Sequence, residues 1–335
     1  MERLNKIFVL GGASLLGYHT LKEAIDRGYS VKTVDIVELS DNLKFKDEDK
    51  VEFIVTNFFA LSDQEIINML RDCDGFVYAG GVDERVVPQK PARKFFYDKN
   101  VLPTQRLARL AKKANVKNFV VFGSYTSQLA ETNIELISHD YDKEPYVETR
   151  LLQEKLAMYE GEGSMNVSIL RLPYVFGTME GKVPIYSMFV DMLRGKDFMP
   201  VTEGGISTVT VSQVGQAAIS ALENGQHGRT YPLATGYISY IDFYQNIVEE
   251  LGQKDQTKLQ IMSFEELEEA YKKDKVLTDK LGVEHGIHQV NMLRANSMEL
   301  KLPTDVAIDE LRVKEEDNKK VIRKTLSLAN RQKLI

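Results

Sequence analysis

The chain has 335 residues, of which 43% are hydrophobic, and its formal net charge is −6. This length suits one large α/β domain with an appended lobe, and the acidic balance argues against nucleic acid as a partner. The only cysteine is Cys73 and the five histidines are scattered, so we expect neither a disulfide framework nor a metal site. Apolar runs stay short of the roughly 18 residues that a membrane span needs. Met1 leads directly into a predicted strand, so we expect no signal peptide. We therefore expect a cytoplasmic protein without membrane contact.

A strand, a glycine turn and a helix are predicted at the start of the chain. Residues 7–10 form an apolar run typical of a buried parallel strand, which Gly11 and Gly12 interrupt, and Leu15 and Leu16 begin an apolar pattern at helical spacing. A helix that starts at such a turn points unpaired backbone N–H groups outward, which suits a pyrophosphate, and glycine allows its close approach. The alternative is an ordinary strand-to-helix turn, because short glycine motifs often match by chance.

The second predicted strand, residues 30–37, carries an acidic residue near its tip. Asp35 follows the glycines by about 20 residues, where a carboxylate accepts both ribose hydroxyls of an adenosine. The same charge repels a 2′-phosphate, so Asp35 predicts NAD as the cofactor rather than NADP. A solvated aspartate at a strand end is the alternative.

Strands and helices alternate through the first half of the chain. Strands are predicted at 51–55, 75–79, 118–122 and 167–172, helices at 64–71, 93–114 and 145–160, and a loop at 125–144. This alternation predicts the α/β class, with a Rossmann-type doubly wound parallel sheet that binds ligands at the carboxyl ends of its strands. The residues that follow strands, and should therefore meet at this edge, include Asn57, Gly80, Gly81 and Ser124.

The second half is less regular. Residues 173–208 are predicted to be rich in loops, with a short strand at 208–211 and helices at 214–223 and 240–251. We expect an NAD-binding domain of residues 1–177, to which 208–225 return. Residues 178–207 and 226–335 should form a smaller, mixed α/β lobe that binds the substrate.

A tyrosine and an arginine on the 145–160 helix carry the candidate chemistry. Tyr146 and Arg150 are four residues apart and so face the same side of a helix. A phenol ordinarily loses its proton near pH ~10, and a neighbouring cation lowers that pKa. Tyr146 is therefore predicted to be a general acid/base towards a carbonyl or alcohol whose oxygen Ser124 also binds. The alternative is a tyrosine and an arginine on the helix surface.

Several motifs, in the right order, resemble extended short-chain dehydrogenases/reductases of the NAD-dependent epimerase/dehydratase family. GGASLLG (11–17) resembles the family's TGxxGxxG, and KNVLPT (99–104) resembles its NVxGT. Tyr146, Arg150 and Glu154 fall at the positions of YxxSKxxxE, and RLPYVFG (171–177) is similar to LRxxNVYG. The resemblance covers roughly residues 1–250 and is loose beyond them.

The resemblance implies the site residues and the assembly. As catalytic residues it implies Ser124, Tyr146 and Arg150. As NAD-binding residues it implies Gly11, Gly12, Ser14, Leu15, Leu16, Gly17, Asp35, Asn57, Ala79, Gly80, Gly81, Asn100, Tyr146, Arg150 and Pro173. It also implies a homodimer through the helices at 93–114 and 145–160, whose many apolar residues fit such an interface.

Four departures from the family pattern bear on function. Ser14 replaces a glycine of the turn, and Arg150 replaces the lysine that serves the catalytic tyrosine, although a guanidinium is not equivalent to an ammonium. Tyr174 stands where the sugar epimerases have an asparagine that contacts the nucleotide-sugar. Residues 207–211 stand where they have RDFVHV, so the arginine that meets a sugar diphosphate is missing. Both differences disfavour a nucleotide-sugar as substrate. We expect an NAD(H)-dependent oxidoreductase, epimerase or dehydratase acting on a small molecule. The alternative is an NAD-binding sensor or regulator with little or no turnover.

Overall fold

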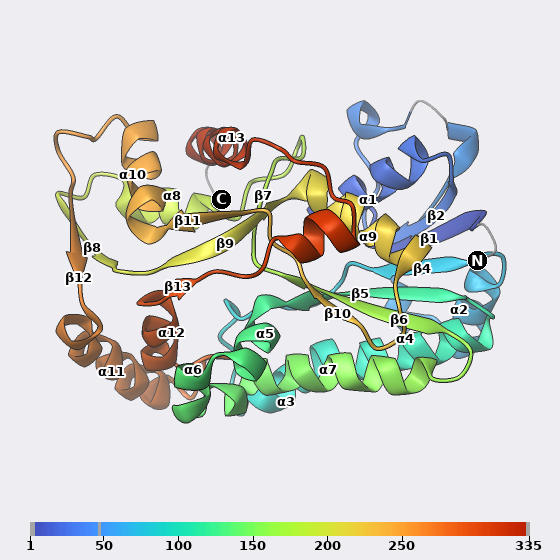
Figure 1. Ribbon diagram of the computed structural model, residues 1–335, viewed down its shortest axis with the longest axis horizontal. Helices are drawn as coiled ribbons and strands as arrows, with labels where there is room; N and C mark the ends of the chain where they lie inside the picture. Colours follow the sequence, from blue (N-terminus) through green and yellow to red (C-terminus); the bar gives the residue numbers. More distant parts are fainter. Residues whose placement is uncertain (1–3, 46–47, 333–335) are drawn as a thin grey trace.

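The computed structural model describes residues 4–45 and 48–332, and its centre is a sheet of seven parallel strands (Figure 1). The strand order is β10-β6-β5-β4-β1-β2-β3. The bounds are β1 Lys6–Leu10, β2 Ser30–Asp35, β3 Val51–Val55, β4 Gly75–Tyr78, β5 Asn118–Ser124, β6 Asn166–Leu172 and β10 Thr230–Pro232. The chain runs outward from β1 to β3 and then returns to β4 beside β1. This reversal confirms the predicted doubly wound sheet and opens a crevice at the carboxyl ends of β1 and β4.

Helices cover both faces of this sheet. On one face, α1 (Leu15–Asp26) packs beside α9 (Val211–Asn224), and on the other lie α2 (Asp63–Leu70), α4 (Leu102–Lys113) and α7 (Pro145–Gly161). The side chains of β1 alternate between the two faces. Ile7 and Val9 pack into the core under α1 and α9, whereas Phe8 and Leu10 pack into the core under α2, α4 and α7. Both faces are buried, which explains why the strands read as continuous apolar runs.

Two predicted segments differ in the structure. Residues 125–144, predicted as a loop, contain α5 (Tyr125–Thr132), α6 (Ile134–Ser138) and a 3₁₀ turn (Tyr141–Lys143). Side-chain caps begin these short helices: Ser124 accepts the Thr126 N–H and Asn133 accepts the Leu136 N–H.

The predicted 93–114 helix is interrupted as well. It consists of α3 (Ala92–Phe96), a π-helical turn (Tyr97–Val101) and α4. Pro103 stands in the first turn of α4 and has no N–H to donate backward, so the helical hydrogen bonding shifts at this point.

The rest of the chain forms a second layered region. Strand β9 (Gly205–Thr210) pairs with β7 (Tyr174–Phe176), β11 (Gly236–Ser239) and β13 (Glu299–Leu300), and β8 (Phe198–Thr202) pairs with β12 (Lys258–Met262). The helices are α8 (Ser187–Leu193), α10 (Tyr240–Glu250), α11 (Phe264–Leu281), α12 (Gln289–Asn296) and α13 (Asn318–Arg331). Residues 173–208 are thus more ordered than predicted, and β10 lies in a segment for which no strand is predicted.

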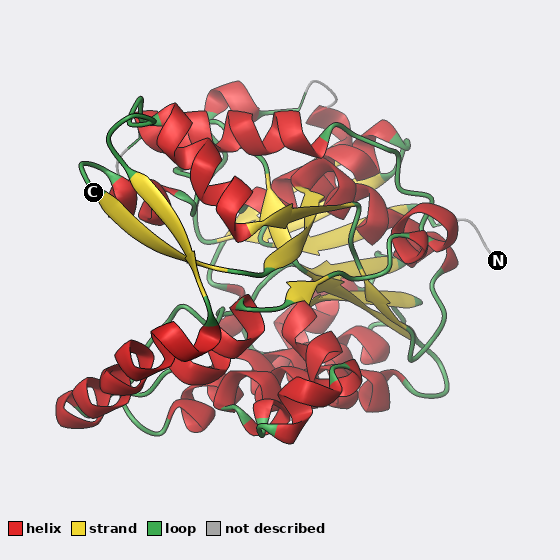
Figure 2. Cartoon of the chain, turned by 60° about the vertical axis from the view of Figure 1, so that its left-hand side comes forward, coloured by secondary structure: helices red, strands yellow, loops and turns green. Residues whose placement is uncertain are grey.

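Helices α11 and α12 form an arm that lies beside α6 and the start of α7 (Figures 1 and 2). We call the segment that joins them, residues 282–288, the strap. None of the helices in the described part of the chain is long and apolar enough to cross a membrane. The division into an NAD-binding domain and a smaller lobe stays a prediction, and the ends of its ranges, residues 1–3 and 333–335, lie outside the described residues.

Candidate active site

A cavity of about 780 Å³ opens at the carboxyl edge of the seven-stranded sheet. Many of the predicted site residues line it: Ser14, Leu15, Leu16, Ala79, Gly80, Gly81, Ser124, Tyr146, Arg150 and Pro173. The other predicted residues, Gly11, Gly12, Gly17, Asp35, Asn57 and Asn100, do not line it and act behind or beside it. The volume lies within the usual range of small-molecule sites.

The glycine turn between β1 and α1 has a steric reason for each glycine. Gly11 has a φ of +93°, which side chains rarely adopt. A Cβ on Gly12 would lie 2.1 Å from Thr33 Oγ1, and one on Gly17 would lie 2.0 Å from the Gly11 carbonyl oxygen. Ser14 is accommodated because it is the N-cap of α1, where its hydroxyl accepts the Gly17 N–H at 3.1 Å. The turn thus brings the start of α1 to the cavity, as anion binding requires.

Asp35 and Asn57 lie at the tips of neighbouring strands. Asp35 Oδ2 accepts the Ala13 N–H at 2.9 Å, so this carboxylate also braces the glycine turn. Asn57 is exposed, and its side chain makes no cap hydrogen bond to the 3₁₀ turn that follows it. Both residues border the same edge of the sheet as the cavity, without lining it.

Asn100 is fully buried and holds the chain that follows β4. Its Oδ1 accepts the Val82 N–H and its Nδ2 donates to the Val82 carbonyl, both at 2.8 Å. These two bonds fix the exit from Gly80 and Gly81, and a Cβ on Gly81 would lie 3.3 Å from Arg150 Nη1. Asn100 therefore shapes the cavity wall through the backbone.

Tyr146, Ser124 and Arg150 meet at the cavity floor. Tyr146 is at the start of α7 and packs edge-on against Phe96, with ring centroids 5.2 Å apart. Ser124 ends β5, and its hydrogen bonding lowers the pKa of Tyr146. The Arg150 guanidinium lies 5.7 Å from the centre of the Tyr146 ring and donates to the Phe122 carbonyl at 2.7 Å. The buried Nε of Arg150 has no hydrogen-bond partner within the described chain, so this N–H is available to a ligand.

The pKa of Tyr146 corrects one expectation. Burial is the largest influence and raises this pKa to about 12, and the negative charges of Glu84 and Asp83 add to the rise. Arg150 lowers it, as predicted, but burial outweighs the arginine, so the phenolate is not accessible below its usual pH in the protein alone. A phenol that keeps its proton at neutral pH is suited to donate it to a substrate oxygen.

The loop after β4 contributes cavity residues that no sequence motif predicts. Asp83 and Arg85 form an ion pair there, and Glu84 lies between them with a pKa that burial and the charge of Asp83 raise. The one feature of the sequence that points to these three residues is their position, because their loop follows the carboxyl end of a predicted strand. A carboxyl group thus faces the same space as Tyr146.

The second half of the chain supplies the opposite wall. Tyr174, Tyr186 and Phe189 line the cavity, and so do strap and α12 residues, namely His285, Ile287, Gln289, Met292 and Asn296. Of these residues, Tyr174 alone falls within a motif of the sequence, RLPYVFG. The others lie outside the motifs or beyond residue 250, where no local pattern points to a site.

Comparisons with known proteins agree with this architecture. The model of the NAD dependent epimerase/dehydratase family matches residues 7–234. Mouse "Sterol-4-alpha-carboxylate 3-dehydrogenase, decarboxylating" is 23% identical over 193 residues, 55% of this chain and 50% of that protein. The chain thus spans about half the length of this relative.

Two further comparisons extend over more of the chain. UDP-glucose 4-epimerase of Bacillus subtilis is 24% identical over 266 residues, 73% of this chain and 72% of that one. The crystal structure of gox2253 superposes with a TM-score of 0.74 at 15% identity and covers 98% of both chains, which shows a shared fold. Because the family model spans most of the chain, including the glycine turn and Tyr146, the protein belongs to the NAD-dependent epimerase/dehydratase family.

Proposed function

We propose that the protein is an NAD(H)-dependent oxidoreductase, epimerase or dehydratase that acts on a hydroxyl or carbonyl group of a small molecule. The observation that carries this proposal is that one cavity is lined both by the start of α1 and by Tyr146 with Ser124. Nucleotide-binding features and an acid/base therefore share one space. Membership of the family supports the same chemistry, and among the relatives one is a dehydrogenase and another an epimerase.

The residues at the carboxyl edge fit a dinucleotide. The backbone at Leu15 and Leu16 would receive the pyrophosphate, and Asp35 would receive the adenosine ribose. The unpartnered Nε–H of Arg150 is a buried donor that a ribose or amide oxygen would satisfy. NAD, when bound, supplies or accepts the hydride.

Within that site the chain's own residues handle the proton. Tyr146 donates a proton to the substrate oxygen, or takes one from it, and Ser124 hydrogen-bonds the same oxygen. Arg150 favours the phenolate that remains after donation, because its positive charge lowers the pKa of Tyr146.

Two observations support a substrate without a sugar diphosphate. Residues 207–211 carry no arginine and do not line the cavity, and the Ser207 hydroxyl is buried and donates to the Leu300 carbonyl. Glu84 lines the cavity, where its charged form would repel a phosphate.

Binding calorimetry tests the cofactor. We expect NADH to bind more tightly than NADPH, and Asp35→Ala to weaken NADH about tenfold through the loss of hydrogen bonds to a charged group. Asp26→Ala, an exposed carboxylate at the other end of α1, is the control and should leave affinity unchanged. Equal or tighter binding of NADPH to the parent protein would contradict the proposal.

Turnover tests the chemistry. A panel of hydroxy and keto compounds should yield a substrate, and Tyr146→Phe should abolish its turnover while NADH affinity is retained. Ser14 and Arg150, which replace a glycine and a lysine of the family pattern, also suit a regulator that binds NAD without catalysis. That alternative predicts NADH binding with no turnover of any panel member, and a change in shape or partner binding instead.

A further inference from the structure

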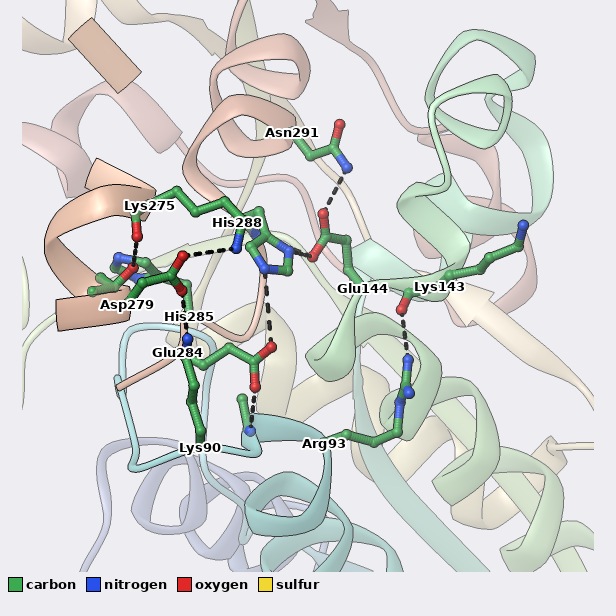
Figure 3. A network of polar contacts seen from close by, with 12 residues as sticks. Lys90, Arg93, Lys143, Glu144, Lys275, Asp279, Glu284, His285, His288 and Asn291 are labelled. Carbon is green, nitrogen blue, oxygen red and sulfur yellow. Dashed lines mark hydrogen bonds and ion pairs between the residues drawn. The ribbon is translucent and has the colours of Figure 1, made fainter. Parts of the chain in front are cut away.

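The strap crosses the beginnings of two helices, α3 and α7 (Figure 3). On the α3 side, the Glu284 N–H donates to the Pro88 carbonyl at 3.0 Å, and its carboxylate accepts the Ala92 N–H at 2.7 Å. Val283 also forms an antiparallel bridge with Gln89. This end of the strap is thereby bound to the chain that leads into α3.

On the α7 side, the strap contacts the proposed acid/base directly. The Gly286 carbonyl accepts the Tyr146 N–H at 2.7 Å. This N–H belongs to the first turn of α7 and has no acceptor within its own helix. A Cβ on Gly286 would lie 2.8 Å from the Tyr146 Cβ and 2.6 Å from Phe96 Cε2, so only glycine fits here without displacement.

A buried carboxylate fastens the strap beside Tyr146. Glu144 precedes α7, and its side chain is 4% exposed. It does not cap its own helix. Its Oε2 instead accepts the His288 Nδ1–H at 2.6 Å and the His288 backbone N–H at 3.0 Å, while Oε1 accepts from Asn291 at 2.6 Å (Figure 3). Both carboxylate oxygens of Glu144, two residues before Tyr146, thus accept hydrogen bonds from the strap and α12.

We propose that the strap is a positioning device for Tyr146, in which Gly286 sets the tyrosine and the Glu144–His288 pair latches the strap to α7. The proposal rests on the proposed role of Tyr146 as acid/base. It assigns Gly286, Glu144 and His288 as positioning residues that act through Tyr146. Because His285 and Ile287 of the same strap line the cavity, the device also joins the substrate wall to the acid/base.

The latch is expected to depend on pH. The hydrogen bond with Glu144 raises the pKa of His288, burial opposes this rise, the charges of Glu144 and Glu284 add to it, and Lys275 of α11 lowers it. A raised pKa in the folded protein means that the stabilising charge is fully present below the ordinary histidine value of about 6.5. It is lost as the pH rises through the raised pKa of His288, so the latch should weaken as the pH rises above the ordinary histidine value.

Amide hydrogen exchange of Tyr146 measures the device without reference to activity. In the parent, the Tyr146 N–H should be protected by Gly286, and Gly286→Ala should speed its exchange by about tenfold, as expected for one hydrogen bond. Gly228→Ala is the control for the same change in open space, because a Cβ there meets nothing within 4 Å; its positive φ, which Gly286 does not have, adds only local backbone strain. NADH affinity, measured by calorimetry, should be the same in all three proteins. In a substrate assay kcat should fall for Gly286→Ala and not for Gly228→Ala.

The pH dependence separates the latch from general stability. Exchange at Tyr146, corrected for its intrinsic pH dependence, should accelerate in the parent as the pH rises through the raised pKa of His288, and exchange in His288→Gln should be fast at every pH. His139→Gln, an exposed histidine at the end of α6, should behave as the parent. Unchanged Tyr146 exchange in both Gly286→Ala and His288→Gln would overturn the proposal, whatever the activity. Loss of protection together with an inactive parent would support the strap and count against the proposed function alone.

Discussion

The pKa of Tyr146 is subject to opposing effects. Burial and the carboxylates of Asp83 and Glu84 raise its pKa, whereas Arg150 and Ser124 lower it. These side chains come from the loop after β4, the end of β5 and the first turns of α7, which meet at the carboxyl edge of the sheet. The identity of a single residue can therefore shift the pH at which the group transfers a proton, and two substitutions should do so in opposite directions.

Glu84→Gln should move activity to lower pH. The change removes a negative charge that raises the pKa of Tyr146, so this pKa should fall. The measurement is the pH dependence of kcat/KM. Glu148→Gln is the control, because it removes the same charge from the helix that carries Tyr146. The Glu148 side chain is 49% exposed, so its charge is screened by solvent. An unchanged profile in Glu84→Gln would show that the carboxylate does not act on Tyr146.

Arg150→Met should move activity to higher pH, because it removes the positive charge that lowers the pKa of Tyr146. Arg150→Lys keeps that charge and should keep the parent's pH profile, while cofactor affinity stays the same or improves. The pH dependence of kcat/KM and NADH calorimetry measure the two effects. A lysine variant as impaired as the methionine variant would show that the guanidinium geometry, rather than its charge, is required.

At the scale of elements, the local sequence pattern predicts those strands and helices whose formation depends on neighbouring residues in the chain. The strands and the helix that begins at Pro145 follow from apolar runs and turn residues, and β3 spans the predicted 51–55. Short helices such as α5 and α6 were missed because polar caps, rather than a long apolar period, define them. The strap could not be predicted, since Gly286 meets Tyr146 through a contact that joins residues 140 positions apart.

The buried ion pair between α7 and β6 should be essential to how these elements pack. Arg171 and Glu154 are 2% and 4% exposed and 2.6 Å apart, so Glu154→Gln leaves a buried guanidinium with less compensation. Because Arg171 keeps its ion pair with Glu131, we expect a loss of about 1.5–3 kcal/mol in the free energy of unfolding, measured by denaturant titration. The Arg229–Glu310 pair has the same 2.6 Å separation but is 44% and 43% exposed, so Glu310→Gln should cost about 0–1 kcal/mol. Equal losses would show that burial does not decide the strength of this pair.

At the scale of the whole molecule, the cavity is closed by two parts of the chain. The sheet edge supplies the glycine turn and Tyr146, and the second half supplies Tyr174, Tyr186 and the arm of α11 and α12. Under the proposed function, substitutions in the second half would alter which substrate fits the cavity, while the glycine turn at the sheet edge stays unchanged.

The outer side of α3, α4 and α7 is the surface on which we expect a second copy of the chain. Leu102 on α4 is 42% exposed and Tyr159 on α7 is 59% exposed. Phe95, Leu151 and Leu156 nearby are only partly buried. Phe96, by contrast, is fully buried and belongs to the interior. A four-helix interface would cover this apolar surface in a homodimer.

Light scattering at micromolar concentration should give twice the mass of one chain. Leu102→Glu with Tyr159→Glu should give the mass of one chain, because two charges would have to be buried in the interface without partners. Leu277→Glu is the control: this residue is also exposed, at 55%, but lies on α11, away from the proposed interface, so it should leave the dimer intact. The strap docks at the starts of α3 and α7, so Tyr146 exchange measured in the double variant would also show whether pairing of the chains reaches the site. A clean monomer mass for the parent would rule out the dimer at this concentration.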